Sequence, residues 1–363
     1  MGPSLLVRAL TSPGSDGVLS ALERRHAHLT RYGSGKAALR DGLAAIADGT
    51  GSVLLPAYLP DGVAEPLYEL GLEPRYYRVR PDLGPDLADL ERRLDDGTVA
   101  AVSVDYFGFP QPRLAGFASL LADRDCYHVE DNAHAPLSVA DGTLLGTRGD
   151  LGITSLRKLL AVPDGALLYC SGDAVRERFE PSAIAGVRER FDGSDWLFLA
   201  KAVATGALES NTRLRRSAET LLASRRDGSA PPSASARYEA GKRPMSKLSV
   251  RLLEAADPDA IRTERRTRYR EWLRYLSARD GLQLLRPELS AGICPQAVPV
   301  RTSAPERLLD DLEAAGVAGA HTWPRLAGPV RADPAYATAR RLAEEVVVVP
   351  IRRRPEAGGL EAR

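Results

Sequence analysis

The first chemical signal is a pair of adjacent carboxylates with a histidine three residues further on. Glu130, Asp131 and His134 follow a short apolar run that is typical of a buried strand. Open α/β sheets bind their ligands at the carboxyl ends of such strands. A carboxylate there could hold a cationic ring nitrogen, and the histidine could meet another group on the same ring. Loop side chains with local hydrogen bonds are the alternative that the segment alone leaves open.

The second signal is Lys158, just past another strand candidate. Ser155 precedes it by three residues, and a tight turn at Asp164-Gly165 follows it. A lysine forms a Schiff base with an aldehyde once neighbouring groups and partial burial lower its pKa. Arg157 beside it could contribute to that shift or bind phosphate. A solvated basic pair beside a hairpin is the alternative on these residues alone.

The third signal is the segment Gly33-Ser34-Gly35-Lys36, which opens a predicted helix. Free N–H groups and the helix dipole make such a start an anion site. The segment is not a P-loop, because a Walker motif needs a glycine five residues before its Gly-Lys pair and a serine or threonine after it. The sequence has Thr30 and Ala37 at those places. We therefore expect a monophosphate group, and not a nucleoside triphosphate, to bind here.

Length and composition limit the class of protein. The 363 residues fit one large domain and a smaller one. A net charge of +1 gives no reason to expect nucleic acid or an anionic membrane as a partner. The three widely spaced cysteines argue against a disulfide framework, and no Cys or His spacing suggests a metal site. With no run of 18 apolar residues and no signal-peptide pattern, we expect a cytoplasmic protein.

An alternation of strands and helices positions the three segments. The strand candidates are residues 52–55, 75–79, 99–106, 126–130, 151–156 and 165–170. The helix candidates among them are residues 36–47, 61–70, 86–94 and 115–122. Because the strands are apolar along their full length, they predict an α/β domain with a mainly parallel sheet flanked by helices.

The remaining chain carries weaker patterns. Residues 17–30 and 174–217 are predicted to be helical, and residues 225–243 to be a loop or a segment that becomes ordered on assembly. The last third has helical spacing at 262–276 and 305–315, with strand candidates at 283–285, 296–300 and 346–351. This pattern indicates a small α+β domain. We divide the chain into an N-terminal arm and helix at 1–30, a large cofactor-binding domain at 31–245 and a small C-terminal domain at 246–363.

A phosphate cradle, a carboxylate for a ring nitrogen and a lysine are the set that pyridoxal phosphate (PLP) chemistry requires. Their order and spacing resemble the DegT/StrS family of PLP-dependent aminotransferases, which act on nucleotide-linked keto sugars. Ser34-Gly35-Lys36-Ala37-Ala38-Leu39 is similar to the family's Ser-Gly-Thr-x-Ala-Leu, and Glu130-Asp131-Asn132-Ala133-His134 to its Glu-Asp-x-Ala-(Gln/His). Gly149-Asp150, Ser155-Leu156, Lys158 and Asp164-Gly165 follow in the family's order. Weaker likeness extends over most of residues 31–351.

The resemblance implies a fold-type-I PLP enzyme and assigns roles to single residues. Lys158 would carry the cofactor as a Schiff base and move a proton. Asp131 would pair with the pyridine nitrogen, and His134 would lie near the 3′-oxygen of the ring. The implied phosphate-binding residues are Ser34, Gly35, Lys36 and Ser155. Tyr58 is a candidate for the aromatic residue that stacks on the ring, with a packed turn tyrosine as the alternative.

The resemblance favours an aminotransferase that takes an amino group from an amino acid, such as glutamate or glutamine, and gives it to a keto or aldehyde sugar or a sugar-like metabolite. It also implies a homodimer with active sites at the subunit interface. The sequence departs from the family pattern in several places: Lys158 follows Ser155 by three residues instead of five, Lys36 replaces a threonine, and Ala166 replaces a glycine. Another PLP-dependent reaction (dehydration, decarboxylation or rearrangement) and a non-catalytic relative therefore stay open. Dehydratases typically replace the lysine with histidine, so the retained Lys158 favours transamination.

Overall fold

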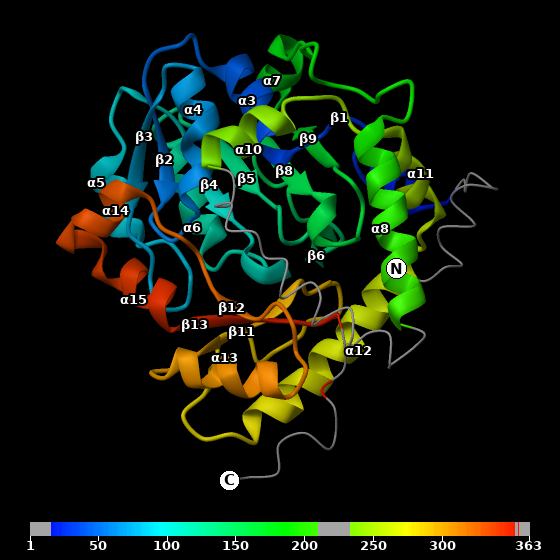
Figure 1. The fold of residues 1–363 in the computed structure, drawn as a ribbon. Helices are drawn as coiled ribbons and strands as arrows, with labels where there is room; N and C mark the ends of the chain where they lie inside the picture. The colour runs from blue at the N-terminus through cyan, green and yellow to red at the C-terminus, as the bar shows by residue number, and fades with distance from the viewer. Residues whose placement is uncertain (1–15, 210–232, 353–354, 356–363) are drawn as a thin grey trace.

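A seven-stranded sheet forms the centre of the computed structural model, which describes residues 16–209, 233–352 and 355 (Figure 1). Its order is β1-β9-β8-β5-β4-β2-β3. The strands are β1 (Leu29–Tyr32), β2 (Ser52–Pro56), β3 (Glu73–Tyr77), β4 (Thr98–Val104), β5 (Tyr127–Asp131), β8 (Leu151–Ser155) and β9 (Ala166–Cys170). Neighbouring strands from β3 to β8 are parallel, whereas β9 and β1 are added antiparallel. The prediction of an α/β fold with a mainly parallel sheet is confirmed.

Helices cover this sheet because each connection between parallel strands must cross over one of its faces. They are α3 (Gly35–Ile46), η1 (Asp61–Ala64), α4 (Glu65–Glu69), α5 (Leu87–Arg93), η2 (Tyr106–Gly108), α6 (Leu114–Ala122) and α7 (Asp173–Arg178). Helix α3 begins where the Ser34 side chain accepts a hydrogen bond from the Ala37 amide, 3.2 Å away. It packs closely on the sheet at Gly42, where a Cβ atom would lie 2.9 Å from Leu168.

A second, antiparallel sheet forms the C-terminal part. Its order is β10-β11-β13-β12, with β10 (Gln283–Leu284), β11 (Ala297–Arg301), β12 (His321–Thr322) and β13 (Val346–Pro350). The helices around it are α12 (Pro258–Ser277), α13 (Pro305–Ala314), α14 (Gly328–Ala332), η4 (Pro334–Tyr336) and α15 (Ala337–Glu345). Buried side chains of both sheets belong to one continuous apolar core. The two sheets are therefore held against each other by a shared interior.

A third group of elements lies around the central sheet, with α10 against α3 and α4. It consists of α2 (Val18–Arg25), η3 (Leu156–Lys158), α8 (Gly193–Glu209), α10 (Ala234–Gly241), α11 (Lys247–Ala255) and the small hairpin β6 (Val139–Ala140) and β7 (Thr143–Leu144). Helix α2 lies against α11, where the Ser20 hydroxyl donates to Glu254 at 2.8 Å. In Figure 1, α10 crosses in front of the central sheet and α8 stands beside it. No helix within the described ranges combines the length and the apolar character that a bilayer span requires.

Three predictions of secondary structure were wrong in part. Residues 17–30 form α2 only as far as Arg25, and β1 follows, because main-chain pairing with β9 places Leu29–Tyr32 at the edge of the sheet. The predicted loop at 225–243 contains α10, which Ser233 caps by accepting a hydrogen bond from Ala236. The predicted helix at 174–217 is divided into α7 and α8. Residues 210–217 and 225–232 of these predictions, and residues 1–15 of the predicted N-terminal arm, lie outside the described residues.

Candidate active site

The central strands deliver the predicted site residues to one edge of the sheet. Asp131 ends β5 and pairs in register with Val104 of β4 and Ile153 of β8. Lys158 lies at the end of η3, the short helix that follows β8 directly. Parallel neighbours end on the same side of a sheet. The acidic segment and the lysine segment are therefore brought together, as the sequence predicts.

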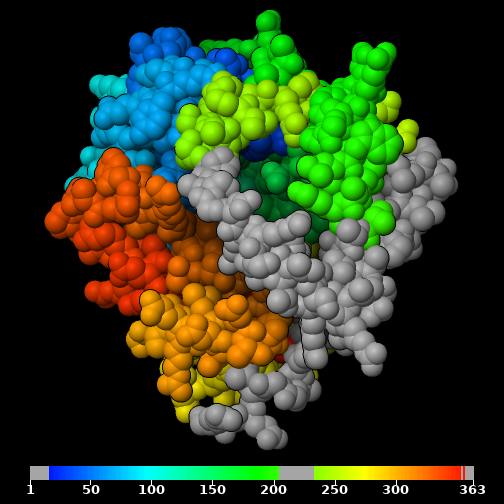
Figure 2. Space-filling view, in the orientation of Figure 1, coloured from blue at the N-terminus to red at the C-terminus, as the bar shows by residue number. Residues whose placement is uncertain are grey.

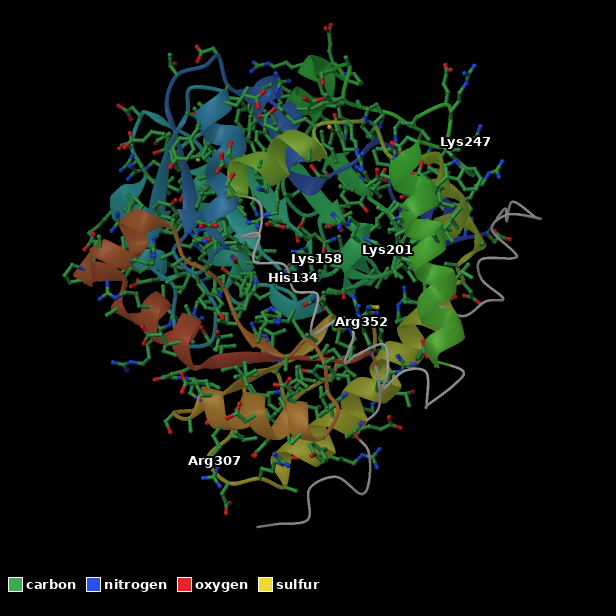
Figure 3. The ribbon with its side chains drawn as sticks, in the orientation of Figure 1. His134, Lys158, Lys201, Lys247, Arg307 and Arg352 are labelled. Atoms are coloured by element: carbon green, nitrogen blue, oxygen red, sulfur yellow. The ribbon has the colours of Figure 1, made fainter. Side chains whose placement is uncertain are left out.

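Lys158 occupies the base of a recess in the surface. Figure 2 shows the surface hollowed between α10 and α8, and Figure 3 places Lys158 in this region with His134 beside it. The side chain is exposed to solvent, yet protein surrounds it on most sides. This desolvation lowers the pKa of Lys158, while the charge of Asp131 works in the opposite direction. The amine makes no hydrogen bond with any residue that the structure describes, so it is available to a ligand.

Asp131 is a buried carboxylate that faces the lysine. One of its oxygens accepts the Ala133 amide at 2.9 Å. Burial raises the pKa of Asp131, and the positive charge of Lys158 lowers it. A buried carboxylate of this kind is stabilised in its ionised form by a cation placed beside it.

His134 is fixed in one tautomer. The backbone N–H of Phe107 donates to its Nδ1 at 3.1 Å. Burial lowers the pKa of His134 well below its usual value, and the charge of Lys158 lowers it further. The imidazole is therefore neutral at pH 7. Because Nδ1 accepts a hydrogen bond, the ring proton is on Nε2, which becomes a donor.

The start of α3 lies beside the end of β8. A Cβ atom on Gly35 would be 3.8 Å from the carbonyl oxygen of Thr154, the residue before Ser155. Within the described ranges, the amides of Gly35 and Lys36 have no acceptor and the Ser155 hydroxyl has no hydrogen-bond partner. The Ser34 oxygen caps the helix, and its own hydrogen makes no bond that the structure records. These are the donors that a phosphate group uses at a helix start.

Two of the predicted residues are placed differently. The Lys36 side chain points toward α10, where Nζ donates to the Ala234 carbonyl at 3.4 Å and lies 5.8 Å from the Tyr238 ring centre. Only its backbone amide stays at the helix start. Tyr58 has no exposed surface, and its hydroxyl donates to the Trp323 carbonyl at 2.5 Å. A cofactor ring cannot stack on a side chain that is sealed in this way, so the packed tyrosine is the correct alternative.

The structure adds two aromatic residues that the sequence analysis did not single out. Phe107 stacks on the His134 ring, with 5.6 Å between centres and 29° between planes. Trp323, from the loop after β12, lies 5.3 Å from the same ring. Both lie within residues 31–351, over which the weaker likeness to the family extends, but that likeness does not indicate contact with His134. That contact depends on how the two sheets meet.

A buried ionic cluster supports the acidic segment from behind. Arg148 donates to Asp105 at 2.7 Å and, through Nε, to Glu130 at 2.6 Å. Both carboxylates are fully buried. Burial and the charge of Glu130 raise the pKa of Asp105. Burial also acts to raise the pKa of Glu130, but the charge and hydrogen bonds of Arg148 outweigh it and lower that pKa. The cluster fixes the strand end that carries Asp131.

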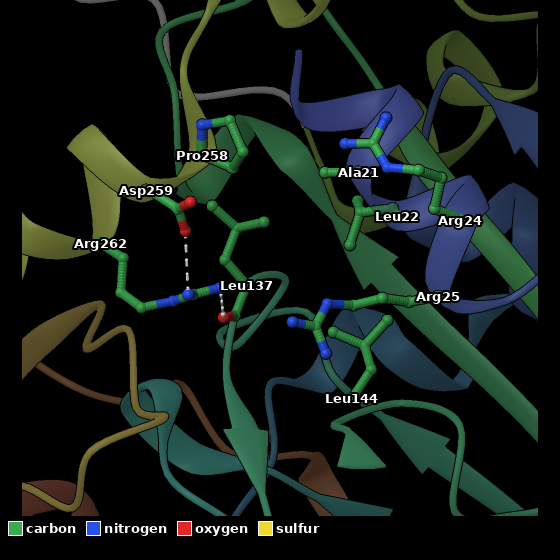
Figure 4. Close-up of a pocket in the computed structure, with 9 residues that line it drawn as sticks. All are labelled: Ala21, Leu22, Arg24, Arg25, Leu137, Leu144, Pro258, Asp259 and Arg262. Atoms are coloured by element: carbon green, nitrogen blue, oxygen red, sulfur yellow. Dashed lines mark hydrogen bonds and ion pairs between the residues drawn. The ribbon is translucent and has the colours of Figure 1, made fainter. Parts of the chain in front are cut away.

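A separate cavity of about 280 Å³ lies away from these residues (Figure 4). It is lined by Ala21, Leu22, Arg24 and Arg25 of α2, Leu137, Leu144, and Pro258, Asp259 and Arg262 of α12. Arg262 donates to the Leu137 carbonyl and pairs with Asp259. None of the predicted site residues lines this cavity.

Within the described ranges, no group of three Cys, His, Asp or Glu side chains is arranged to hold a metal ion.

The sequence matches a known protein family. A model of the DegT/DnrJ/EryC1/StrS aminotransferase family matches residues 19–203, just over half of the chain. The chain belongs to this family. The match begins in α2 and ends in α8, so it contains every predicted site residue.

One relative in sequence and two solved structures are similar to this chain. A dTDP-4-dehydro-2,3,6-trideoxy-D-glucose 4-aminotransferase of Saccharopolyspora spinosa is 30% identical over 146 residues. That match spans 39% of this chain and only 37% of the relative. The sugar aminotransferase CalS13 from Micromonospora echinospora has a TM-score of 0.66 at 20% identity, covering 97% of this chain and 92% of that one. A GDP-4-keto-6-deoxymannose-3-dehydratase with a trapped PLP-glutamate geminal diamine has a TM-score of 0.63 at 14% identity, covering 96% and 92%. These structural likenesses establish that family members of both kinds share the fold.

Proposed function

We propose that the chain is a PLP-dependent aminotransferase that transfers an amino group from an amino acid, glutamate or glutamine, to a keto or aldehyde sugar or a sugar-like metabolite. The observation that carries the proposal is the unpaired Lys158 amine facing the buried Asp131 carboxylate, with neutral His134 beside them. The curated relative and CalS13 are both named as sugar aminotransferases, which supports the choice of acceptor class.

The donor set fits PLP at each end of the cofactor. The unpaired amides of Gly35 and Lys36, with the Ser155 and Ser34 hydroxyls, supply hydrogen bonds for a phosphate. Asp131 supplies a buried negative charge for a protonated ring nitrogen. The Nε2 hydrogen of His134 supplies a donor for an oxygen on the ring. Lys158 supplies the amine that PLP requires.

Bound PLP would act as an electron sink for the bond between the substrate Cα atom and its hydrogen. The chain's own residues would do the rest. Burial lowers the pKa of Lys158, which increases the share of the free amine that can accept a proton from the substrate carbon and return it to a neighbouring atom. Asp131 would keep the ring nitrogen protonated. Phe107 and Trp323 would exclude water from the His134 side of the site.

The retained lysine favours aminotransfer over dehydration. A dehydratase shares the fold, so architecture does not separate the two reactions. Lys158 is the residue that can both carry the cofactor and shuttle the proton, and its amine is unencumbered within the described ranges. The next experiment tests whether Lys158 carries the cofactor and whether an amino acid can donate its amine to it.

The test is an absorption spectrum of the purified protein with added PLP, before and after glutamate. We expect a visible Schiff-base band that is absent in Lys158→Ala and present in Lys247→Ala, a control at an exposed lysine whose amine donates to the Glu189 carbonyl. Glutamate or glutamine should bleach this band and release the corresponding keto acid. A band that neither donor bleaches would favour another PLP-dependent reaction. No band at all would refute the enzyme assignment.

We further propose a cytoplasmic homodimer with active sites near the subunit interface. Trp196, Leu197 and Val203 of α8 expose 61%, 56% and 62% of their surface, and exposed apolar side chains on one helix are typical of an interaction surface. The three cysteines are buried and unpaired, as in reducing compartments. Light scattering measures the mass of the native protein with and without PLP. A mass of one chain under both conditions would contradict the dimer.

A further inference from the structure

Arg265 of α12 is a charged side chain with an unusual set of partners. It is half-buried, and no carboxylate lies within ion-pair distance among the residues that the structure describes. Its guanidinium instead donates to the carbonyl groups of two separate loops. Nη2 donates to Leu159 at 2.7 Å and to Lys158 at 3.5 Å. Nη1 donates to Pro295 at 3.1 Å and to Gln296 at 3.3 Å.

The first of these loops ends the short helix that carries Lys158. Carbonyl groups at a helix end have no partner within the helix, and they carry a partial negative charge. Arg265 supplies both the missing donors and a positive charge at this end. The position of the Lys158 backbone therefore depends on a residue more than a hundred positions further along the chain.

The second loop continues to His134. The Gln296 amide donates to the Phe107 carbonyl at 2.8 Å, and the Phe107 amide donates to His134 Nδ1 at 3.1 Å. Gly108 presses against the same loop, because a Cβ atom there would lie 2.8 Å from the Cys294 carbonyl oxygen. One continuous chain of contacts thus joins the Lys158 turn, Arg265, the 295–296 loop and the His134 ring.

We infer that Arg265 is a positioning residue that fixes the Lys158 turn relative to His134 by bridging the two loops. The catalytic role of Arg265 rests on the proposed function. The geometry of the bridge does not depend on a bound cofactor. Loss of the guanidinium would remove a hydrogen bond from each of four carbonyl oxygens and would free the Lys158 turn to move away from the protein around it. A guanidinium is suited to this role because its planar fork reaches two loops at once, whereas an ammonium group cannot.

The neighbouring Arg266 offers a matched control. Its guanidinium donates to the carbonyl groups of Ser290 at 2.5 Å, Ile293 at 2.8 Å and Leu289 at 3.5 Å. It is on the same helix and also donates to backbone oxygens, but none of them belongs to the Lys158 turn. Arg266→Gln should therefore cost stability of the same order without moving Lys158.

The test measures the reactivity of the Lys158 amine itself. The full-length chain is freed of bound carbonyl compounds with hydroxylamine and labelled with an amine reagent across a pH series. Mass spectrometry then compares labelling at Lys158 with labelling at Lys247. Protein surrounds Lys158, with Asp131 and His134 as the titratable groups that act on it. Release toward solvent should raise its pKa by about one unit, which lowers the free-amine fraction at neutral pH about tenfold.

We expect Arg265→Gln to slow labelling of Lys158 about tenfold, while Arg266→Gln leaves it within about twofold of wild type. Arg265→Lys keeps the charge but not the fork, so it should resemble Arg265→Gln. Equal slowing in the two glutamine variants, or none in either, would overturn the inference, as would full restoration by lysine. If Arg265→Gln does not fold, Arg265→Lys and Arg266→Lys give the same comparison. The labelling experiment uses no PLP. If the chain never binds PLP, the proposed function is refuted, but the labelling rates still test the role of Arg265.

Discussion

Phe107 holds the His134 imidazole from two directions. Its amide donates to Nδ1 at 3.1 Å, and its ring stacks on the imidazole at 5.6 Å. The Phe107 backbone has a φ of 60°, a conformation that few non-glycine residues adopt. The residue is therefore held in an uncommon geometry at the place where it fixes the tautomer of a candidate active-site histidine.

Replacement of His134 should remove the hydrogen-bond donor on Nε2. We expect His134→Leu to lower kcat about a hundredfold, as loss of one oriented donor does in other active sites. His134→Gln should retain more activity, because its amide can donate from a similar position. Steady-state kinetics of both variants, with folding checked by circular dichroism, measure the difference. Equal loss in both variants would show that the donor is not what matters.

The capture of PLP should depend on pH through Lys158. The free amine is the reactive form, so the rate should rise with pH through a midpoint below that of an ordinary lysine, because burial lowers the pKa of Lys158. The Asp131 charge opposes this shift. Asp131→Asn should therefore move the midpoint to lower pH. The measurement is the initial rate of band formation across a pH series. A midpoint at higher pH in Asp131→Asn than in the wild type would contradict the prediction.

Removal of Arg148 should destabilise the protein strongly. Arg148→Met would leave Glu130 as an uncompensated buried charge, which costs about 3–5 kcal/mol in other proteins. Arg113 gives the contrasting case, since its 2.7 Å ion pair with Asp82 is at the surface, and Arg113→Met should cost about 1 kcal/mol or less. Urea denaturation of the two variants measures both values. Similar losses would show that the buried cluster is not an ionic one.

Gly152 in β8 should tolerate no side chain. A Cβ atom there would lie 1.6 Å from the Gly146 carbonyl oxygen, a backbone atom that cannot move aside alone. We expect Gly152→Ala to lower the free energy of unfolding by about 3 kcal/mol or more. Gly193→Ala is the control, because nothing lies within 4 Å of its added Cβ atom. Thermal unfolding of both variants should show a large decrease only for Gly152→Ala.

The central strands and the three site segments could be predicted from the sequence because each signal is local. Apolar runs such as 52–55 and 151–156 are continuous, and they correspond to β2 and β8. Lys158, Asp131 and His134 each follow a strand end, and strand ends of one parallel sheet meet at a common edge. Rules about a single segment were enough for these residues.

The remaining features depend on contacts between distant segments. β1 is four residues long, and only its pairing with β9 makes it a strand. Tyr58 is sealed by Trp323, a residue 265 positions away, so its burial could not be inferred from its own turn. Arg265 carries no motif, and its partners lie in two loops that its own helix does not predict.

The parallel pairing of β5 and β8 also has a consequence for the order of folding. Asp131 ends the first of these strands and Lys158 follows the second, and the chain between them must leave the sheet and return before they can meet. Such non-local pairing forms slowly, since the entropy of closing the connection is lost before the contact is gained. A nascent chain that ends before β8 lacks Lys158. PLP capture would therefore report the pairing of β5 with β8, and the appearance of the visible band during refolding would time that step.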